Sequence, residues 1–483
     1  MRTAHRVETV RAAEHALMAR LPEGTLMRRA SAGLAASAAT LLGRVYGTRV
    51  ALLAGSGGNG GDALFAGARL ARRGAKVTAV LLDPDRAHPG GLAALRAARA
   101  DVVSAAQGPA RAALARADLV LDGVTGIGGR GGLRADAARL VAELSAPVLA
   151  VDLPSGVDAD TGEVRGDAVR ALATVTFGAL KPGLLVAPAQ VYAGAVRLVD
   201  IGLGPYLPGE PDLEALQHAD AAALLPRPGA SSDKYRRGVL GIAAGSARYP
   251  GAAVLAVSGA LRGGAGAVRY AGTAASEVIA RHPETLVTSG SPAEAGRVQA
   301  WAVGPGLGDG ADARRAVGEA LDADVPVLVD ADGLRHADPA RVRARRAATV
   351  LTPHAGEAAA LLDTPREAVE AARLDSVRAL ARRYGATVLL KGSATLVADA
   401  EGPVRVNPTG TGRLATAGSG DVLSGLIGSL LAAGLSGRDA AAVGAYLHGV
   451  AGRLAPTPPA ASDVAAALPA AWRELDAAPH GPV

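Results

Sequence analysis

The stretch from 49 to 73, RVALLAGSGGNGGDALFAGARLARR, decides the fold of the first half of the chain. Its apolar start, 49–54, predicts a short β-strand, and its Ala- and Leu-rich end, 62–73, predicts a helix. Glycines between the two let the backbone approach a ligand closely, and free N–H groups at a helix start favour an anion such as a pyrophosphate. A plain tight turn would also use glycines, but Asn59 and Asp62 add polar groups that favour a binding loop.

Apolar runs alternate with helical segments on both sides of this stretch. In the first half we expect a helix at 133–144 and further strands at 76–83, 118–122, 147–151, 174–177 and 195–199. In the second half we expect two closing helices at 419–433 and 439–454, after strands at 239–244, 267–271, 301–303, 325–329, 349–351 and 387–390. Short β-rich runs separated by helices indicate βαβ units, so we predict two α/β domains, each with a parallel sheet between two helical layers.

Chain length and a proline-rich stretch together predict the domain boundary. At roughly 100 to 200 residues per domain, 483 residues suggest two or three domains. A polar stretch with several prolines, 205–228, is interpreted as a linker, so we expect one domain at 1–215 and another at 222–476. The last residues, 477–483, are expected to form a loose tail.

Composition excludes several classes of function. The chain has no cysteine, which excludes disulfide scaffolds, thiolate zinc sites and a cysteine nucleophile. Its 51 basic and 45 acidic side chains are interleaved, so the net charge of +6 favours a solvated Arg-rich surface over a nucleic-acid site. Because residues 1–20 lack an apolar block and the longest uncharged stretch, 422–437, is short, we expect no signal peptide, no membrane span and a cytoplasmic protein. Lysine and asparagine are rare, and those that fall in motifs are Asn59, Asn407, Lys181 and Lys391.

Two more strands of the first half end in loops of glycine and polar residues. Loop 122–132 reads DGVTGIGGRGG, and loop 151–162 reads VDLPSGVDADTG. The carboxyl ends of parallel strands form the ligand crevice of an open sheet, so these loops and the loop at 54–62 indicate one site. Asp152 is the best candidate for an acid or a base, although a single Asp is more often a turn or cap residue. Hard oxygen ligands suited to a cation come from Asn59, Asp122 and Ser155.

The longest glycine-rich run of the second half, VNPTGTGRLATAGSGD at 406–421, leads into an apolar helix. N–H groups at that helix start can hold a transferring phosphoryl group, and the carboxylate of Asp421 can take the proton of an attacking hydroxyl. An Asp in a first helical turn capped by Ser419 is also common, but this run is longer than capping requires.

Other strand ends of the second half add polar candidates. KGSAT at 391–395 offers an ammonium and hydroxyls for a nucleotide phosphate. PHAGE at 353–357 contains His354, which is either a contact to a phosphate or substrate hydroxyl or a structural histidine. GPGLG at 304–308 and DADGL at 330–334 end two more strands at the same predicted edge.

Several motifs together make the first half resemble a known family. GNGGD at 58–62, the Asp122 loop, VDLPSGVDADTG and FGALKPGLL at 177–185 are similar to the NAD(P)H-hydrate epimerase domain, also called the YjeF N-terminal domain. The resemblance covers roughly residues 7–204 and implies a Rossmann-like fold. It also implies a potassium ion held by Asn59, Asp122 and Ser155. The implied contacts to the substrate are Gly58, Asn59, Gly60, Gly61, Asp62, Gly126, Ile127, Gly128, Gly129, Arg130, Gly131, Gly132 and Asp152.

The second half resembles another family. GSGD at 418–421 is similar to the ribokinase-like superfamily, and with GPGLG, DADGL, TPHAGE and KGSAT it resembles the ADP/ATP-dependent NAD(P)H-hydrate dehydratase branch over about 225–475. The resemblance implies that Asp421 is the base for phosphoryl transfer from ADP or ATP with Mg²⁺. The implied nucleotide contacts are Lys391, Gly392, Ser393, Ala394, Thr395 and Gly420. The implied contacts to the hydrated dinucleotide are Ala252, Gly306, His354 and Asp421.

The two resemblances in this order imply an enzyme that repairs NADHX and NADPHX, the forms of NADH and NADPH hydrated at C6 of the nicotinamide ring. The first domain would interconvert the R and S epimers, with Asp152 assisting proton transfer, and the second would dehydrate the S epimer with release of phosphate. The expected partners are these small molecules and ADP or ATP, and the Ala-rich helices suit a homo-oligomer. Two alternatives stay open: a ribokinase-like kinase of vitamin precursors, and a first domain that binds nucleotides without catalysis.

Overall fold

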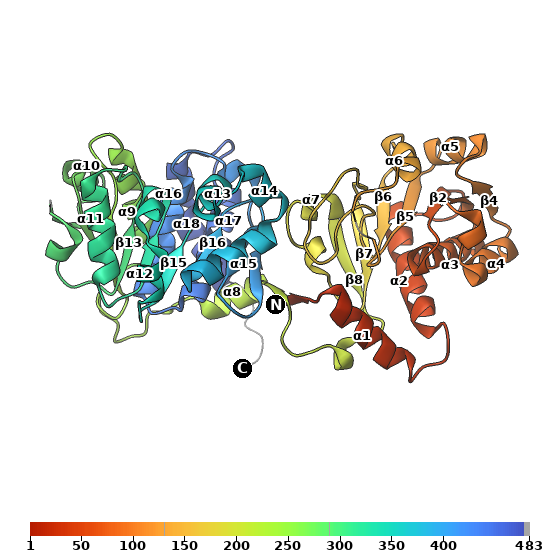
Figure 1. Ribbon diagram of the computed structural model, residues 1–483, viewed down its shortest axis with the longest axis horizontal. Helices are drawn as coiled ribbons and strands as arrows, with labels where there is room; N and C mark the ends of the chain where they lie inside the picture. The colour runs from red at the N-terminus through yellow and green to blue at the C-terminus, as the bar shows by residue number, and fades with distance from the viewer. Residues whose placement is uncertain (130, 289, 478–483) are drawn as a thin grey trace. The chain divides into compact units, whose positions relative to one another are not determined.

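A computed structural model describes residues 1–129, 131–288 and 290–477, and it divides the chain into two compact units (Figure 1). One unit is Thr3–Asp212, and the other begins at Leu213 and includes Met1–Arg2. The division falls inside the stretch 205–228 that the sequence predicted as a linker. Of the predicted tail, residues 478–483 lie outside the described residues.

The first unit contains a seven-stranded sheet in which every neighbouring pair is parallel, as predicted. The strand order is β4-β3-β2-β5-β6-β7-β8, so the chain changes direction across the sheet between β2 and β5. In open α/β sheets the ligand crevice lies at such a switch point, beyond the carboxyl ends of the strands. The strands are β2 (Arg49–Ala54), β3 (Lys76–Leu81), β4 (Asp101–Ser104), β5 (Leu119–Gly123), β6 (Val148–Val151), β7 (Ala173–Phe177) and β8 (Ala195–Val199).

Helices cover both faces of this sheet. Successive residues of β2 point to opposite sides, so Leu52 packs with one apolar cluster and Leu53 with another. The first cluster includes residues of α1 (Val7–Met18), α2 (Thr25–Leu42), α3 (Gly58–Arg72) and α4 (Pro89–Ala97). The second includes residues of α5 (Gly108–Ala115) and α6 (Ala135–Ala142), and a short helix α7 spans Gln190–Ala193.

Helix α3 begins four residues earlier than the sequence predicted, because its first residue is Gly58 rather than Asp62. The reason is the close approach of the helix start to the preceding loop. A Cβ atom on Gly60 would lie 2.1 Å from the backbone oxygen of Gly55, so a side chain there would be excluded. The residues Gly58 to Asp62 are therefore the first turn of a helix, with its N–H groups directed at the carboxyl edge of the sheet.

The second unit contains ten strands, β9 to β18, of an eleven-stranded sheet in the order β1-β9-β18-β17-β16-β15-β14-β13-β10-β11-β12. The strands from β12 through β10 to β16 are parallel, whereas β17 and β18 form antiparallel pairs that the sequence did not predict. The strands are β1 (Arg2–Ala4), β9 (Leu213–Ala215), β10 (Val239–Ala243), β11 (Ala267–Ala271), β12 (Leu286–Thr288), β13 (Ala300–Val303), β14 (Val327–Val329), β15 (Thr349–Leu351), β16 (Thr387–Leu390), β17 (Thr395–Ala398) and β18 (Val404–Asn407).

Helices α9 and α16 form the centre of this unit. The backbones approach closely because glycines line the crossing: a Cβ on Gly425 would lie 1.9 Å from the oxygen of Ala256. The helices of the unit are α8 (His218–Leu224), α9 (Pro250–Arg262), α10 (Ala275–Arg281), α11 (Ala311–Asp322), α12 (Pro339–Arg343), α13 (Ala355–Leu362), α14 (Arg366–Ala371), α15 (Arg373–Tyr384), α16 (Ser419–Ala432), α17 (Gly437–Leu454) and α18 (Ala461–Asp476). Within the described ranges, none of the helices has the length and apolar character needed to cross a membrane.

Two features of the second unit differ from the prediction. Part of the proline-rich stretch 205–228 forms β9, which pairs in parallel with β18, and α8, so this part is structured rather than a free linker. A third closing helix, α18, follows the two that were predicted. It was missed because it contains Pro469, which usually breaks a helix, although Leu468 and Ala471 are fully buried.

Candidate active sites

A pocket of about 460 Å³ lies at the carboxyl edge of the first unit, where β2, β5, β6 and β7 end. Three loops that the sequence placed together, after β2, β5 and β6, do meet in this pocket. The predicted substrate residues that line it are Gly58, Asn59, Asp62, Gly126, Ile127, Gly128, Gly129 and Asp152. The lining also includes residues of the quoted motifs, Ser56, Gly57, Val124, Thr125 and Phe177, and three residues outside those motifs, Arg11, Glu14 and Arg134.

The other predicted glycines lie beside the pocket rather than in its lining. Gly60 and Gly61 are buried in the first turn of α3. Gly131 has a φ of +76°, and a Cβ on Gly132 would meet the backbone oxygen of Arg165 at 2.5 Å, so both shape the loop. Arg130 lies outside the described residues.

Asp152 is held in a strained and buried position. Its φ is +66°, which residues with a side chain rarely adopt, and it is 7% exposed. Lys181 donates to its Oδ1 at 2.5 Å, and the hydroxyl of Thr176 donates to the same oxygen at 3.0 Å. Because both donors contact Oδ1, Oδ2 is the oxygen directed to a ligand. The sequence marked Lys181 only as a rare lysine within a motif, and the structure places its ammonium on the candidate acid or base, Asp152.

A second carboxyl, Asp62, lies in the same pocket without a cation beside it. Its Oδ1 is buried and has no hydrogen-bond partner among the described residues. Burial, and then the neighbouring carboxyls of Asp152 and Glu14, raise the pKa of Asp62 well above its ordinary value. Burial also raises the pKa of Glu14. The pocket therefore combines a lysine-bound carboxylate with a buried carboxyl whose pKa is raised well above its ordinary value.

The three predicted potassium ligands are adjacent. The Ser155 hydroxyl donates to Asp122 Oδ1 at 2.7 Å, and the Ser155 N–H donates to Asp122 Oδ2 at 2.8 Å. The Asn59 amide donates to the Thr125 carbonyl at 3.0 Å, which leaves its own oxygen as an acceptor. Asp122 is fully buried, and burial raises its pKa to about 6, although hydrogen bonds from Ser155 and from the Val124 N–H act in the opposite direction.

In the second unit, a buried network joins Lys391 to Asp330 at the carboxyl edge. Lys391 donates to Asp330 Oδ1 at 2.7 Å, and the Ser424 hydroxyl on α16 donates to Asp330 Oδ2 at 2.6 Å. Glu357 lies 3.7 Å from the same ammonium. Burial disfavours the ammonium, but Asp330 and Glu357 outweigh it and raise the pKa of Lys391. The lysine is therefore a fixed positive charge.

Asp421 lies in the first turn of α16, as predicted, next to this network but without an ion pair of its own among the described residues. Burial, followed by the charge of Asp330, raises its pKa to about 7, while Lys391 acts in the opposite direction. A carboxylate with a pKa near the working pH is suited to accept a proton from a hydroxyl. Gly420 also lies beside the lysine, because a Cβ atom on it would be 3.5 Å from the Lys391 ammonium.

The remaining predicted residues of the second unit are the implied dinucleotide contacts Ala252, Gly306 and His354 and the implied nucleotide contacts at 392–395. Gly306 and Ala252 are neighbours, because a Cβ on Gly306 would lie 2.6 Å from that of Ala252. His354 is exposed and caps α13, where it shares a capping box with Glu357. In the run 391–395, Gly392 and Ser393 are exposed, whereas Ala394 and Thr395 are buried.

Sequence reasoning missed two buried residues of this site. Asp330 was noted only as part of a strand end, although it is the partner of Lys391. His448 on α17 lies 3.3 Å from the hydroxyl of Ser419, and burial lowers its pKa to about 4, so it is neutral. No local pattern marks His448, because its partner is 29 residues away in the chain.

Each unit thus has a lysine–aspartate pair and an unpaired carboxyl at the carboxyl edge of an α/β sheet, next to a helix start that can bind phosphate. This combination defines an enzyme with two sites for phosphorylated substrates that undergo proton transfer. The comparison with known proteins identifies the family.

A family model described as YjeF-related protein N-terminus matches residues 23–183, and one described as NAD(P)H-hydrate dehydratase matches residues 240–471. The bifunctional NAD(P)H-hydrate repair enzyme Nnr of Mycobacterium leprae is 50% identical over 473 residues, which cover 96% of each chain. The protein of the same name from Mycobacterium tuberculosis is 51% identical over 451 residues, 92% of each chain. The crystal structure of the Bacillus subtilis ADP/ATP-dependent NAD(P)H-hydrate dehydratase, co-crystallised with ATP/Mg²⁺, matches with 30% identity and a TM-score of 0.50, covering 54% of this chain and 97% of that chain.

The chain belongs to the family of bifunctional NAD(P)H-hydrate repair enzymes. It combines an NAD(P)H-hydrate epimerase domain with an ADP/ATP-dependent NAD(P)H-hydrate dehydratase domain. The predictions of two α/β domains, of the family and of a bifunctional enzyme are confirmed. The alternative of a vitamin-precursor kinase is left without support, because the match to repair enzymes extends over both domains.

Proposed function

We propose that Asp421 is the base of the dehydratase. The observation that carries this is a carboxyl with a pKa of about 7 in the first turn of α16, beside the fixed charge of Lys391. Asp421 takes the proton of the C6 hydroxyl while the hydroxyl oxygen attacks the terminal phosphorus of ADP or ATP. The phosphate ester is a better leaving group than hydroxide, so the C6–O bond then breaks, a proton leaves C5, and the C5–C6 double bond is restored.

Lys391 and the N–H groups at the start of α16 stabilise the transferred phosphoryl group. Lys391 is 19% exposed and held by Asp330, so it needs no reorganisation when charge develops. Mg²⁺ fits here as an ion carried by the nucleotide: the described residues contain no group of three acidic or histidine side chains placed to bind a metal alone. Mg²⁺ commonly binds through phosphates, waters and one or two carboxylates, and Glu357 would be such a carboxylate. The ion supplies charge neutralisation on the phosphates.

In the first domain, Asp152 and Asp62 act as a base and an acid. Asp152 Oδ2 accepts the proton of the C6 hydroxyl as the C6–N1 bond breaks, which leaves an aldehyde at C6. The Asp62 carboxyl, whose pKa is raised by burial and by the nearby Asp152 and Glu14, gives its proton to N1. Rotation about the C4–C5 or C5–C6 bond exposes the other face of the aldehyde, and the reverse proton transfers close the ring as the other epimer.

The Asn59, Asp122 and Ser155 cluster fits a potassium ion. Its oxygens are hard ligands, and the buried carboxyl of Asp122 lacks a basic partner among the described residues, so a monovalent cation would balance its charge. The ion would hold the β5 and β6 loops at the distance that the pyrophosphate requires. The remaining loop glycines, 126–129, let the backbone approach the phosphates.

The test is repair of a mixture of both NADHX epimers by the purified full-length chain with Mg²⁺, K⁺ and either ADP or ATP. Recovery of NADH absorbance together with free phosphate supports the mechanism and names the phosphoryl donor. Accumulation of a stable phosphorylated dinucleotide without NADH would contradict it. Recovery that stops once the S epimer is consumed, apart from slow spontaneous epimerisation, would contradict the catalytic role of the first domain.

We also propose that the enzyme acts in the cytoplasm as a homo-oligomer. The support is an exposed apolar surface near the edge strand β8, where Leu172, Val191 and Leu198 are 55%, 55% and 47% exposed. Sedimentation analysis of the full chain tests the oligomer. A single species at the mass of one chain, 47.8 kDa, at micromolar concentration would contradict it.

A further inference from the structure

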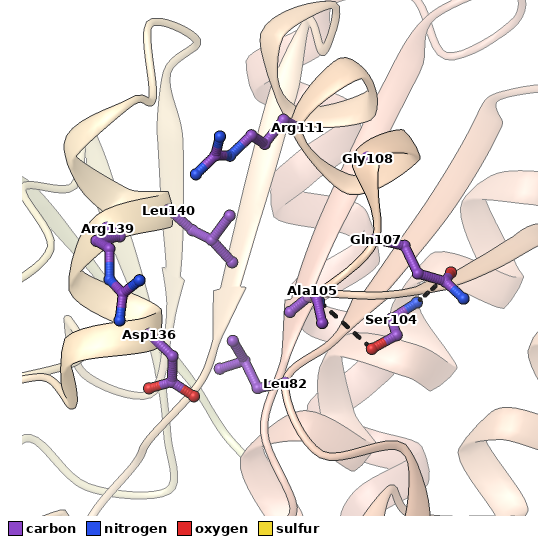
Figure 2. Close-up of a pocket in the computed structure, with 10 residues that line it drawn as sticks. Leu82, Ser104, Ala105, Gln107, Gly108, Arg111, Asp136, Arg139 and Leu140 are labelled. Carbon is purple, nitrogen blue, oxygen red and sulfur yellow. Dashed lines mark hydrogen bonds between the residues drawn. The ribbon is translucent and has the colours of Figure 1, made fainter.

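The first unit has a second cavity, of about 450 Å³, on the sheet face covered by α5 and α6 (Figure 2). We call it the α5–α6 pocket. Leu82, directly after β3, and Ser104, the last residue of β4, form its base, and α5 and α6 form its walls. Its volume is within the range of about 300 to 1,000 Å³ that small-molecule sites have. None of the roles described above uses it.

The walls of the α5–α6 pocket combine apolar and charged groups. Leu82 and Leu140 supply apolar surface, and Figure 2 shows Arg111 and Arg139 on opposite walls with Leu140 between them. Arg111 Nε lies 3.3 Å from Glu143, and Arg139 Nε donates to the Ala135 carbonyl at 3.1 Å. These contacts hold the stems of the two arginines and leave their terminal N–H groups for a ligand.

The chemistry of these walls matches a nucleoside phosphate, which has a flat base, a ribose and a phosphate. A flat base can lie between the leucines and a guanidinium, because guanidinium groups are attracted to the faces of π systems. The same arginines can bind phosphate oxygens by charge-assisted hydrogen bonds. The carboxylate of Asp136 at the start of α6 can accept a bond from a ribose hydroxyl.

The position of the α5–α6 pocket relative to the catalytic pocket supports the same ligand. Asp152 follows β6 on one side of the switch point, and Leu82 follows β3 on the other side. The two strands are three positions apart in the sheet, about 14 Å at the usual strand spacing. A dinucleotide lies across such a switch point with its pyrophosphate at the helix start and its halves on opposite sides.

The two pockets are also adjacent along the chain. Arg134 lines the catalytic pocket, whereas Asp136 and Arg139, less than two helical turns further on, line the α5–α6 pocket. A ligand whose pyrophosphate contacts the loop 124–129 therefore has one end near Asp152 and can direct the other end over α6.

We infer that the α5–α6 pocket binds the adenosine phosphate half of the hydrated dinucleotide while the nicotinamide half is epimerised beside Asp152. This rests on the proposed catalytic role of the Asp152 pocket. The consequence is that the adenosine half contributes to substrate affinity and takes no part in the proton transfers.

The experiment measures epimerisation of the R epimer by the full-length chain carrying Asp421→Asn, so that dehydration does not consume the product. Two substrates are compared: NADPHX, and hydrated reduced nicotinamide mononucleotide, which lacks the adenosine half. The variant is Arg111→Ala/Arg139→Ala, and the control is Arg116→Ala, an exposed arginine at the end of α5 outside the pocket. All the replaced arginines are exposed, so folding is not at risk.

We expect the double variant to raise KM for NADPHX about tenfold, with kcat unchanged, because it loses two charge-assisted contacts. KM for the mononucleotide should stay the same, and Arg116→Ala should leave both substrates unaffected. An unchanged KM for NADPHX, or an equal rise for the mononucleotide, would overturn the inference.

A second measurement covers the case in which the mononucleotide is not turned over. Adenosine 2′,5′-bisphosphate should inhibit NADPHX epimerisation competitively, with an inhibition constant about tenfold higher in the double variant. Absence of inhibition in the parent chain, or equal inhibition of both chains, would contradict the inference that the α5–α6 pocket binds the adenosine phosphate half. A parent chain that does not epimerise NADPHX at all would instead contradict the proposed function of the first domain, and the inference with it.

Discussion

The Lys181–Asp152 pair of the first unit and the Lys391–Asp330 pair of the second are alike in length, at 2.5 and 2.7 Å, and both aspartates are buried. They differ in what the aspartate faces. Asp152 lines the substrate pocket, with one oxygen left for a ligand. Asp330 is enclosed, because its second oxygen accepts the Ser424 hydroxyl. In the first unit the aspartate of the pair is therefore open to a ligand, whereas in the second unit the aspartate is enclosed and holds the lysine in place.

The two carboxyls without an ion pair among the described residues, Asp62 and Asp421, differ in the charges around them. Asp62 has two other carboxyls as neighbours, and its pKa is raised well above the ordinary value. Asp421 has Lys391 nearby, which opposes the effect of burial and of Asp330, so that its pKa is about 7. On the proposed mechanism, the same residue type would serve as an acid in one site and as a base in the other, because burial acts on both carboxyls but the neighbouring charges differ.

The largest effect is expected at Asp421. Asp421→Asn keeps the size of the side chain but removes the proton acceptor, so dehydration should fall about 10³-fold, within the range for general-base catalysis. Epimerisation should be unchanged, because it takes place in the other unit. NADH formation from S-NADHX and epimer exchange followed by chromatography measure the two. Retention of dehydration in this variant, with exposed Asp375→Asn as the control, would contradict the role of Asp421.

At Asp62 the expected effect is the reverse: epimerisation is lost and dehydration is retained. Asp62→Asn removes the proton donor while Lys181 still holds Asp152, so epimerisation should fall about 10²-fold with little change in dehydration of the S epimer. Exposed Asp85→Asn is the control. If Asp62→Asn raises KM but leaves kcat unchanged, Asp62 only binds substrate, and the contrast with Asp421 does not hold.

The pH dependence of the dehydratase should follow Asp421. Its pKa is raised from the ordinary value to about 7, so the basic form is lost as the pH falls through 7. Below that pH, kcat/KM should decrease by about tenfold per unit, since one proton blocks the base. The measurement is initial rate at low S-NADHX concentration between pH 5.5 and 8.5. A flat profile would assign the proton transfer to another group.

The smallest effect concerns potassium. K⁺ and a proton compete for Asp122, whose raised pKa of about 6 means that the carboxyl is neutral at pH 5 in the folded protein without the ion. Replacing K⁺ by choline should therefore lower the stability of the first unit by about 1 to 3 kcal/mol at pH 8, and by less at pH 5. Thermal unfolding in the two salts measures this. Asn59→Ala should remove the difference, and an equal effect at both pH values would contradict the site.

The sequence predicted most of the fold and the outline of each site. Strands such as β2 and β10 are buried apolar runs between turn residues, and the loops after them carry the glycines and aspartates, so local patterns were sufficient. Predictions failed where the secondary structure of a segment depends on packing against residues far away in the sequence. The burial of Leu468 stabilises α18 despite Pro469, and pairing with β18 orders β9 within a polar stretch.

The same distinction applies to the sites. Asp152, Asp421, Asn59 and Lys391 lie in glycine-rich motifs, so residue type and spacing indicated them. Glu14 and His448 come from helices whose sequences resemble any amphipathic or buried helix. Their proximity to the sites depends on the packing of α1 and α17, and the raised pKa of Asp62 depends in part on neighbours up to 90 residues away.

The most direct test of two cooperating sites uses pure R-NADHX, which an S-specific dehydratase, as proposed, would not accept. The full-length chain with ATP, Mg²⁺ and K⁺ is expected to convert all of it to NADH much faster than spontaneous epimerisation allows. Asp62→Asn and Asp421→Asn should each stop this recovery, whereas a mixture of the two variants should restore it, because each retains the site that the other lacks. NADH formation at only the spontaneous rate by the unmodified chain would contradict the account.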